Sequence, residues 1–146
     1  MLKQFVPVHD DAQPLHEAGE VVLVTLGNYL EERERCQPKM RPAIILSPGP
    51  CQHTIIGLTT KPAFATSGQP RAEIPAPIEL GLERRRSFLW AARPSRLCRL
   101  DVRRHLGWVD LDTVELLSKE MLLPRWMLVG LMRAAAAAHR GPIKPK

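Results

Sequence analysis

Apolar residues in the first two thirds of the chain come in short runs that turn residues interrupt. Residues 21–26 are β-branched and apolar on both faces, residues 43–47 form another apolar run, and residues 53–60 alternate, so each segment predicts a strand. Residues 87–90 predict a fourth strand, and residues 106–109 predict a last short strand or turn. Together these segments predict a domain that is mostly β.

Charged and proline-rich segments connect the predicted strands. Residues 29–40 are highly charged and form either a helical turn of solvated ion pairs or a flap over a site. Residues 61–77 are rich in Pro, Ser, Gly and Ala and predict a loop, with a possible short edge strand at residues 71–74. Residues 96–102 alternate weakly, which places Leu100 on one face and the arginines toward water.

The hydrophobic period changes near residue 110, where helical spacing replaces alternation. Asp112 is positioned to cap a helix whose apolar residues recur at this spacing, namely Leu111, Val114, Leu117 and Met121. Pro124 ends or restarts this helix, and residues 125–139 favour a second one. The second helix is apolar almost all round. We therefore expect it to be buried on two sides, either by the sheet and a second subunit or within one core.

Length and composition indicate one globular domain, because the 146 residues are 45% apolar and 25% charged. We expect a loosely ordered N-terminal extension over residues 1–18, a folded domain over 19–140 and a basic disordered tail over 141–146. No apolar run approaches the roughly 20 residues of a membrane span, and the N-terminus lacks a signal-peptide pattern. The three cysteines form no C-x-x-C pair, so reduced thiols and a cytoplasmic location are expected.

Positive charge is concentrated in one window of the sequence. Between Glu83 and Arg104, eight arginines stand against two acidic residues, and the resulting net charge of +6 equals that of the whole chain. Guanidinium groups bind phosphate oxygens in bidentate fashion and stack on bases. We expect the window to form one cationic region that contacts a polyanion. A solvated basic face or a docking surface for an acidic protein are the alternatives.

Two polar residues stand at the ends of predicted strands. Proline restricts the residue before it to extended conformations, so Pro42 should hold Arg41 at the entrance of the second strand, within reach of a phosphate. Alternation along the third strand places Gly57 and Thr59 on one face if Ile56 points into the core. Glycine inside a strand permits close approach of a ligand or another backbone, or a bulge. A register slip would expose Thr60 in place of Thr59.

Several kinds of site have no support in the sequence. There is no P-loop, G-x-G-x-x-G, H-E-x-x-H or paired-cysteine zinc spacing, and the five histidines are scattered. We therefore expect no metal, no cofactor and no Ser-His-Asp arrangement.

Four segments, taken in order, resemble the MazF/PemK family of toxin endoribonucleases. They are Gly19-Glu20-Val21-Val22-Leu23-Val24, Arg41-Pro42-Ala43-Ile44-Ile45-Leu46-Ser47, Ile55-Ile56-Gly57-Leu58-Thr59-Thr60 and Ser87-Phe88-Leu89, followed by a C-terminal helix. The resemblance covers residues 19–132 and depends on order and spacing.

The resemblance implies a small SH3-like β-barrel of the MazF/PemK/CcdB type with C-terminal helices. It also implies a homodimer, a small acidic antitoxin as partner, and metal-independent cleavage of single-stranded RNA that inhibits growth. The family's catalytic arginine falls on Arg41 and its catalytic threonine on Thr59. The residues expected to contact RNA are Thr60, Lys61, Arg93, Arg96 and Arg99.

The chain departs from the family pattern at two places. Residues 31–40 replace the usual Gly-x-Glu-Gln-x-Gly loop, and Ala92-Arg93 stands where the family has an acidic residue followed by Gln. Two alternatives therefore stay open: a non-catalytic barrel that binds nucleic acid or protein, and a poison of DNA gyrase that resembles the CcdB toxins.

Overall fold

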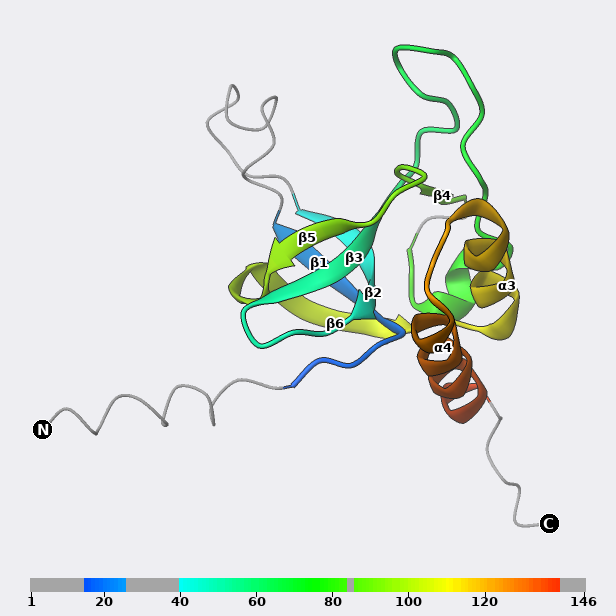
Figure 1. Cartoon of the computed structure of the whole chain (residues 1–146). Coiled ribbons are helices and arrows are strands. Elements are labelled where there is room, and N and C mark those ends of the chain that lie inside the picture. The colour runs from blue at the N-terminus through cyan, green and yellow to red at the C-terminus, as the bar shows by residue number, and fades with distance from the viewer. Residues whose placement is uncertain (1–14, 26–39, 84–85, 140–146) are drawn as a thin grey trace, which may run out of the picture.

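The computed structural model describes residues 15–25, 40–83 and 86–139, and its centre is a six-stranded antiparallel sheet. The strand order is β4-β3-β2-β1-β6, and β5 also pairs with β3 (Figure 1). The strands are β1 (Glu20–Thr25), β2 (Met40–Ser47), β3 (Gln52–Thr59), β4 (Phe88–Leu89), β5 (Ser95–Cys98) and β6 (Val102–Trp108). Two C-terminal helices follow, α3 (Leu111–Glu120) and α4 (Arg125–Ala138).

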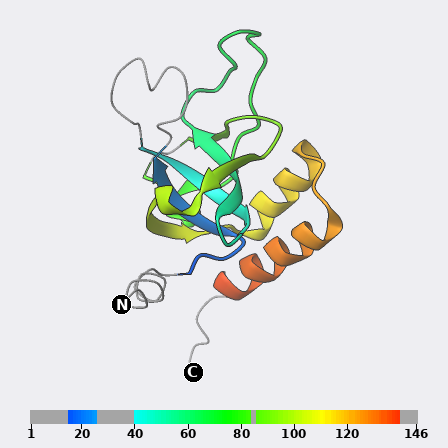
Figure 2. The same cartoon turned by 60° about the vertical axis from the view of Figure 1, so that its left-hand side comes forward.

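The sheet is apolar on both faces, which explains the continuous apolar runs of β1 and β2. One face carries Ile44 and Ile56 and packs against Leu117 and Leu131 of the helices, all of them buried. The two helices lie together on one side of the sheet (Figure 2). The other face has its own buried cluster, which consists of Val22, Val24, Ala43, Ile45, Ile55 and Leu97.

The structure confirms the predicted strands 21–26, 43–47, 53–60 and 87–90 over their described residues. β2 begins earlier than predicted, because Met40, Arg41 and Pro42 pair with Thr25, Val24 and Leu23 of β1. β6 is also longer than predicted, because its consecutive exposed residues Arg103, Arg104 and His105 give no apolar pattern in the first half of the strand.

The weak alternation across residues 96–102 was wrongly interpreted. The chain leaves β5 at Cys98, forms a short 3-10 helix η3 (Arg99–Asp101) and enters β6 at Val102. Leu97 is buried instead, and Leu100 is 57% exposed on the turn. The turn resets the alternation, so a pattern read straight through it assigns the wrong face.

Helix α3 is capped by Asp110 and not by Asp112. The Asp110 side chain accepts a hydrogen bond of 2.9 Å from the backbone N–H of Thr113, and Asp112 lies within the first turn, where its charge favours the helix. Pro124 precedes α4, as predicted. Helix α4 buries only one stripe, since Trp126 is 64% exposed and Met132 is 50% exposed.

Some sequence expectations fall outside the described residues. They include most of the charged connection at 29–40, residues 1–14 of the predicted extension, and the predicted tail at 141–146. The last residues of the extension contact the fold, because His16 and the backbone N–H of Glu17 bond to the Glu20 carboxylate. Among the described helices, none is long and apolar enough to cross a membrane.

Candidate functional site

Strands β2 and β3 bring Arg41 and Thr59 to the same end of the sheet. In the described parts of these antiparallel strands, pairing ends at Ala43 opposite Gly57, and Arg41 and Thr59 each lie two residues beyond that pair. Pro42 accounts for the end of the pairing, because it has no amide proton to donate to β3. The two strands are therefore adjacent but unpaired where the predicted catalytic side chains stand.

Arg41 and Thr59 line one cavity of about 440 Å³. Its other lining residues include Thr60, which is exposed, and Arg104 of β6. Lys61, the next residue predicted to contact RNA, is exposed beside this opening. Three of the predicted site residues thus share a cavity, and a fourth adjoins it.

Thr59 is 4% exposed and has a fixed hydroxyl position. Its Oγ1 accepts a hydrogen bond of 3.2 Å from the backbone N–H of Lys61. A hydroxyl that accepts one bond still has a proton to donate. Thr59 therefore presents a donor in a geometry that the turn after β3 holds in place.

The Arg41 guanidinium stacks on an indole that the sequence did not identify as part of the site. Its Cζ lies 4.7 Å from the centre of the Trp90 ring, and its buried Nε has no hydrogen-bond partner in the structure. Such stacking orients the plane of the fork and contributes about 0.5–1 kcal/mol at exposed sites, and more where water is excluded.

Arg71 occupies the same cluster and ties the loop after β3 to it. Its guanidinium donates to the carbonyls of Trp90, Lys61 and Ala63 at 3.0, 3.2 and 2.7 Å. Its Cζ lies 4.4 Å from the Phe64 ring centre and 5.3 Å from that of Trp90. Burial, followed by the nearby charge of Arg41, lowers the pKa of Arg71. Two guanidinium groups therefore share one indole, and the local potential is positive.

Trp90 lies over Gly57. This close approach is consistent with a glycine at that position of β3 but does not require one. The Trp90 backbone N–H donates to the Gly57 carbonyl at 2.8 Å, so a second backbone does approach there. A Cβ at Gly57 would lie 3.5 Å from the Trp90 Cβ, which is an ordinary contact. The available signal for Trp90 was a large aromatic residue at the end of a predicted strand.

The wall of the cavity opposite β3 requires glycine. The 3-10 helix η2 (Pro77–Leu80) rests on β6 so closely that a Cβ at Gly107 would overlap the Leu80 carbonyl. Gly81, which ends η2 with φ of 90°, similarly faces the Leu106 carbonyl. Backbone of one element therefore packs directly on backbone of the other, and neither glycine has room for a side chain.

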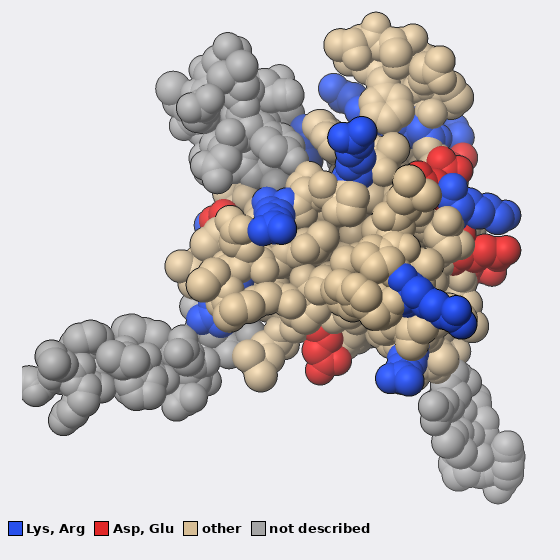
Figure 3. All heavy atoms as spheres, viewed as in Figure 1, with Lys and Arg blue, Asp and Glu red and all other residues tan. Residues whose placement is uncertain are grey.

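Of the described arginines in the charged window, only Arg104 lines the cavity. Arg93 is exposed between β4 and β5, Arg96 is exposed on β5, and Arg99 lines a different cavity near the start of β3. Arg86 forms a two-pronged ion pair with Glu73, with both bonds at 2.9 Å. On the face shown in Figure 3, lysine and arginine side chains lie at several separate places.

Neither a family model nor a curated protein matches this chain. In the described residues, no cluster of three or more His, Cys, Asp or Glu side chains is arranged to hold a metal ion. The geometry of the cavity and its charges therefore carries the functional argument.

Proposed function

We propose that this protein is a metal-independent endoribonuclease that cleaves single-stranded RNA, and that it acts as the toxin of a type II toxin-antitoxin system. The observation that carries the proposal is the meeting of Arg41 and Thr59 in one cavity, at strand ends that are adjacent but not paired with each other. A closed SH3-like barrel of the MazF/PemK type is the finer fold that we propose for the antiparallel sheet.

The reaction in this proposal is an internal transesterification. The 2′-oxygen of one ribose attacks the adjacent phosphorus and the bond from phosphorus to the 5′-oxygen breaks, which leaves a 2′,3′-cyclic phosphate and a 5′-hydroxyl. Solvent accepts the proton from the 2′-hydroxyl and supplies the proton for the 5′-oxygen. The protein then has to stabilise extra negative charge on a five-coordinate phosphorus and to hold the strand in line.

Arg41 suits the first task and Thr59 suits the second. The Arg41 guanidinium remains charged at all working pH values and is oriented by Trp90, so it acts as an electrostatic clamp on the phosphate oxygens. The Thr59 hydroxyl donates to one phosphate oxygen and fixes its position. Arg71 strengthens the positive potential without leaving the loop carbonyls that it binds.

The partners follow from the same proposal. A small acidic antitoxin would neutralise a chain of net charge +6, and the exposed apolar residues of α4 are available to a second subunit. Growth inhibition in the cytoplasm is the expected effect of the free toxin.

Inducible expression of wild type and Arg41→Ala, with growth and new RNA 5′ ends monitored, tests the proposal. We expect growth arrest and new 5′-hydroxyl ends with wild type, and neither with Arg41→Ala. Arg86→Ala is the matched control, because Arg86 is exposed, pairs with Glu73 and does not line the cavity. If wild type produces no new ends, the nuclease proposal is wrong.

A non-catalytic nucleic-acid-binding domain is the second candidate. The observation that favours it is that the Arg41 guanidinium already stacks on Trp90, as in a site built to bind and not to react. Purified protein that retains an intact RNA oligonucleotide on a filter would support this function. Toxicity in Arg41→Ala together with gyrase-trapped DNA breaks would instead support a gyrase poison.

A further inference from the structure

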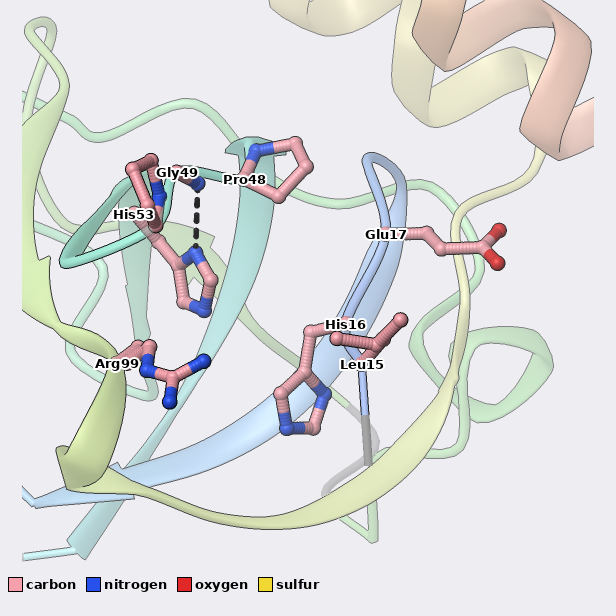
Figure 4. Close-up of a pocket in the computed structure, with 8 residues that line it drawn as sticks. Leu15, His16, Glu17, Pro48, Gly49, His53 and Arg99 are labelled. Atoms are coloured by element: carbon pink, nitrogen blue, oxygen red, sulfur yellow. Dashed lines mark hydrogen bonds between the residues drawn. The ribbon is translucent and has the colours of Figure 1, made fainter. Parts of the chain in front are cut away.

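A second cavity, of about 400 Å³, lies at the end of β3 opposite Thr59. It is formed by the turn Pro48-Gly49-Pro50 between β2 and β3, by residues 15–17, and by His53 and Arg99 (Figure 4). Thr59 lies six positions after His53 in β3, which corresponds to roughly 20 Å along the strand. One phosphate-sized group therefore cannot contact both cavities at once.

His53 presents a buried donor to this cavity. The side chain is on a residue only 4% exposed, and its Nδ1 accepts a hydrogen bond of 3.2 Å from the backbone N–H of Gly49. Because a backbone N–H only donates, Nδ1 carries no proton, and the proton of the neutral ring lies on Nε2. Nε2 is buried and has no hydrogen-bond partner, which is unusual for a native side chain.

Two further nitrogen-bearing side chains converge with His53. Figure 4 shows Arg99 and His16 turned toward the same space, whereas the Glu17 carboxylate points away from it. The His16 ring meets the His53 ring edge-on, with their centres 6.0 Å apart. His16 Nδ1 bonds to Glu20 Oε2 at 3.0 Å, and His105 Nδ1 bonds to the same oxygen at 2.8 Å. The Glu20 carboxylate is therefore already held by two imidazoles.

We infer that this cavity binds a phosphate group, with His53 Nε2–H and the Arg99 guanidinium as its donors. Donors that approach from different segments suit the oxygens of a tetrahedral anion, whereas a planar carboxylate would leave one side unmatched. The phosphate comes either from the backbone of a bound nucleic-acid strand or from a free phosphate. The inference does not depend on cleavage at Arg41, and its test is separate from the test of the nuclease.

Titration of the full chain with inorganic phosphate tests the inference, with the imidazole and guanidinium N–H signals followed by NMR. We expect the His53 Nε2–H signal to shift and saturate. His53→Asn keeps an oxygen where Nδ1 accepts from Gly49 but removes the Nε2 donor. Arg99→Gln removes the charge while its backbone N–H still bonds to the Cys51 carbonyl. Each variant should lower phosphate affinity at least about tenfold.

Lys119→Gln is the control, because Lys119 lies on α3 and pairs with Glu115 far from the cavity. It should bind phosphate as wild type does. Acetate in place of phosphate should leave the His53 signal unmoved, and an equal response to acetate would overturn the assignment to phosphate.

A short single-stranded DNA oligonucleotide, which has no 2′-hydroxyl to react, identifies the source of the phosphate. If the site takes a strand phosphate, the oligonucleotide displaces inorganic phosphate. Arg99→Gln then lowers the slope of log affinity against log salt concentration for the oligonucleotide by about one. If the oligonucleotide leaves the His53 signal unchanged while inorganic phosphate shifts it, a free phosphate is the ligand. No response to either probe means that the cavity holds only water, and the inference is then wrong.

Discussion

The two ends of β3 use the same strand for different electrostatics. At the Thr59 end, two guanidinium groups share the Trp90 ring, so the charge is fixed at every working pH. At the His53 end, a neutral imidazole accepts one backbone N–H and has a buried Nε2 without a partner, beside a cavity that the residue lines. Under the two proposals, the Thr59 end would stabilise charge, and the His53 end would recognise a group by hydrogen bonding.

Removing the charge at the Thr59 end should have the largest effect. Arg41→Ala should lower the rate of RNA cleavage by about 10²–10³-fold, because one preorganised donor to the developing charge is lost. A single-turnover assay with a labelled oligonucleotide measures this. Arg41→Lys should recover only part of the rate, since an ammonium lacks the fork and its stacking on Trp90. A full rate in Arg41→Ala would contradict the proposed role of Arg41 in cleavage.

Glycine-to-alanine substitutions show which parts of the packing around the Thr59 end can accept an added Cβ and which cannot. Gly107→Ala should destabilise the fold by about 1–3 kcal/mol, because its Cβ would overlap the Leu80 carbonyl, and a backbone atom cannot move aside. Gly57→Ala is the matched variant and should be nearly neutral, since its Cβ has ordinary contacts with Trp90. Urea unfolding of both proteins checks this. Equal loss in both would mean that the Trp90 side of the cavity is as tightly packed as the η2 side.

Substitution of Arg71 measures how much its bonds to the loop after β3 stabilise the cluster of Arg41, Arg71 and Trp90. Arg71→Lys should lower the free energy of unfolding by roughly 1–2 kcal/mol, because a lysine cannot reach three carbonyls and stack on Phe64 together. The same change at Arg86, an exposed residue paired with Glu73, should matter less. Proteolysis within residues 61–71 should also accelerate in Arg71→Lys alone.

The pH dependence of folding stability near neutral pH should come from the His53 end. Burial, followed by the nearby His16 and the charge of Arg99, lowers the pKa of His53 below its ordinary 6.5. The unfolded chain therefore binds more protons than the folded chain as the pH falls below 6.5, and stability is lost from there down through the lowered pKa. Urea midpoints measured between about pH 8 and pH 5.5 should fall in wild type and less in His53→Asn.

Glu20 should contribute a second and more acidic transition. Burial alone would raise the pKa of its carboxyl, but hydrogen bonds from His105 and His16 outweigh burial and leave the pKa below 4.5. Its stabilisation is complete above pH 4.5 and is lost as the pH falls through the lowered value. Glu20→Gln should abolish this transition and leave the one near His53. Identical curves for both variants would contradict the separation of the two groups.

The sequence predicted the strand centres well because their apolar runs are buried on both faces. It missed η2 and η3, since three or four residues of 3-10 helix carry no hydrophobic period. The choice of Asp112 over Asp110 as the helix cap was wrong because both are good caps, and only the register of the turn decides between them.

The site was predictable where local chemistry determines it and not where distant contacts do. Pro42 restricts Arg41, and the alternation of β3 singles out Thr59, so both could be named from short segments. The exposure expected of Thr59 was wrong, because Thr59 is buried and Thr60 is exposed. Arg71 and Trp90 are nineteen residues apart, and their contact depends on how a long loop returns to the sheet. The prediction of a single cationic region assumed that neighbours in sequence share a face, whereas Arg86, Arg96 and Arg103 lie on different elements.

Pro42 has a mechanical consequence for the protein. β2 is paired with β1 from Met40 to Ile44, but on the Arg41 side of Ala43 nothing in the described backbone pairs it with β3. Spreading these strand ends apart therefore breaks no ladder bond, and its resistance comes only from side-chain contacts such as the stacking of Arg41 on Trp90. One missing amide proton gives an otherwise stiff sheet an aperture of adjustable width.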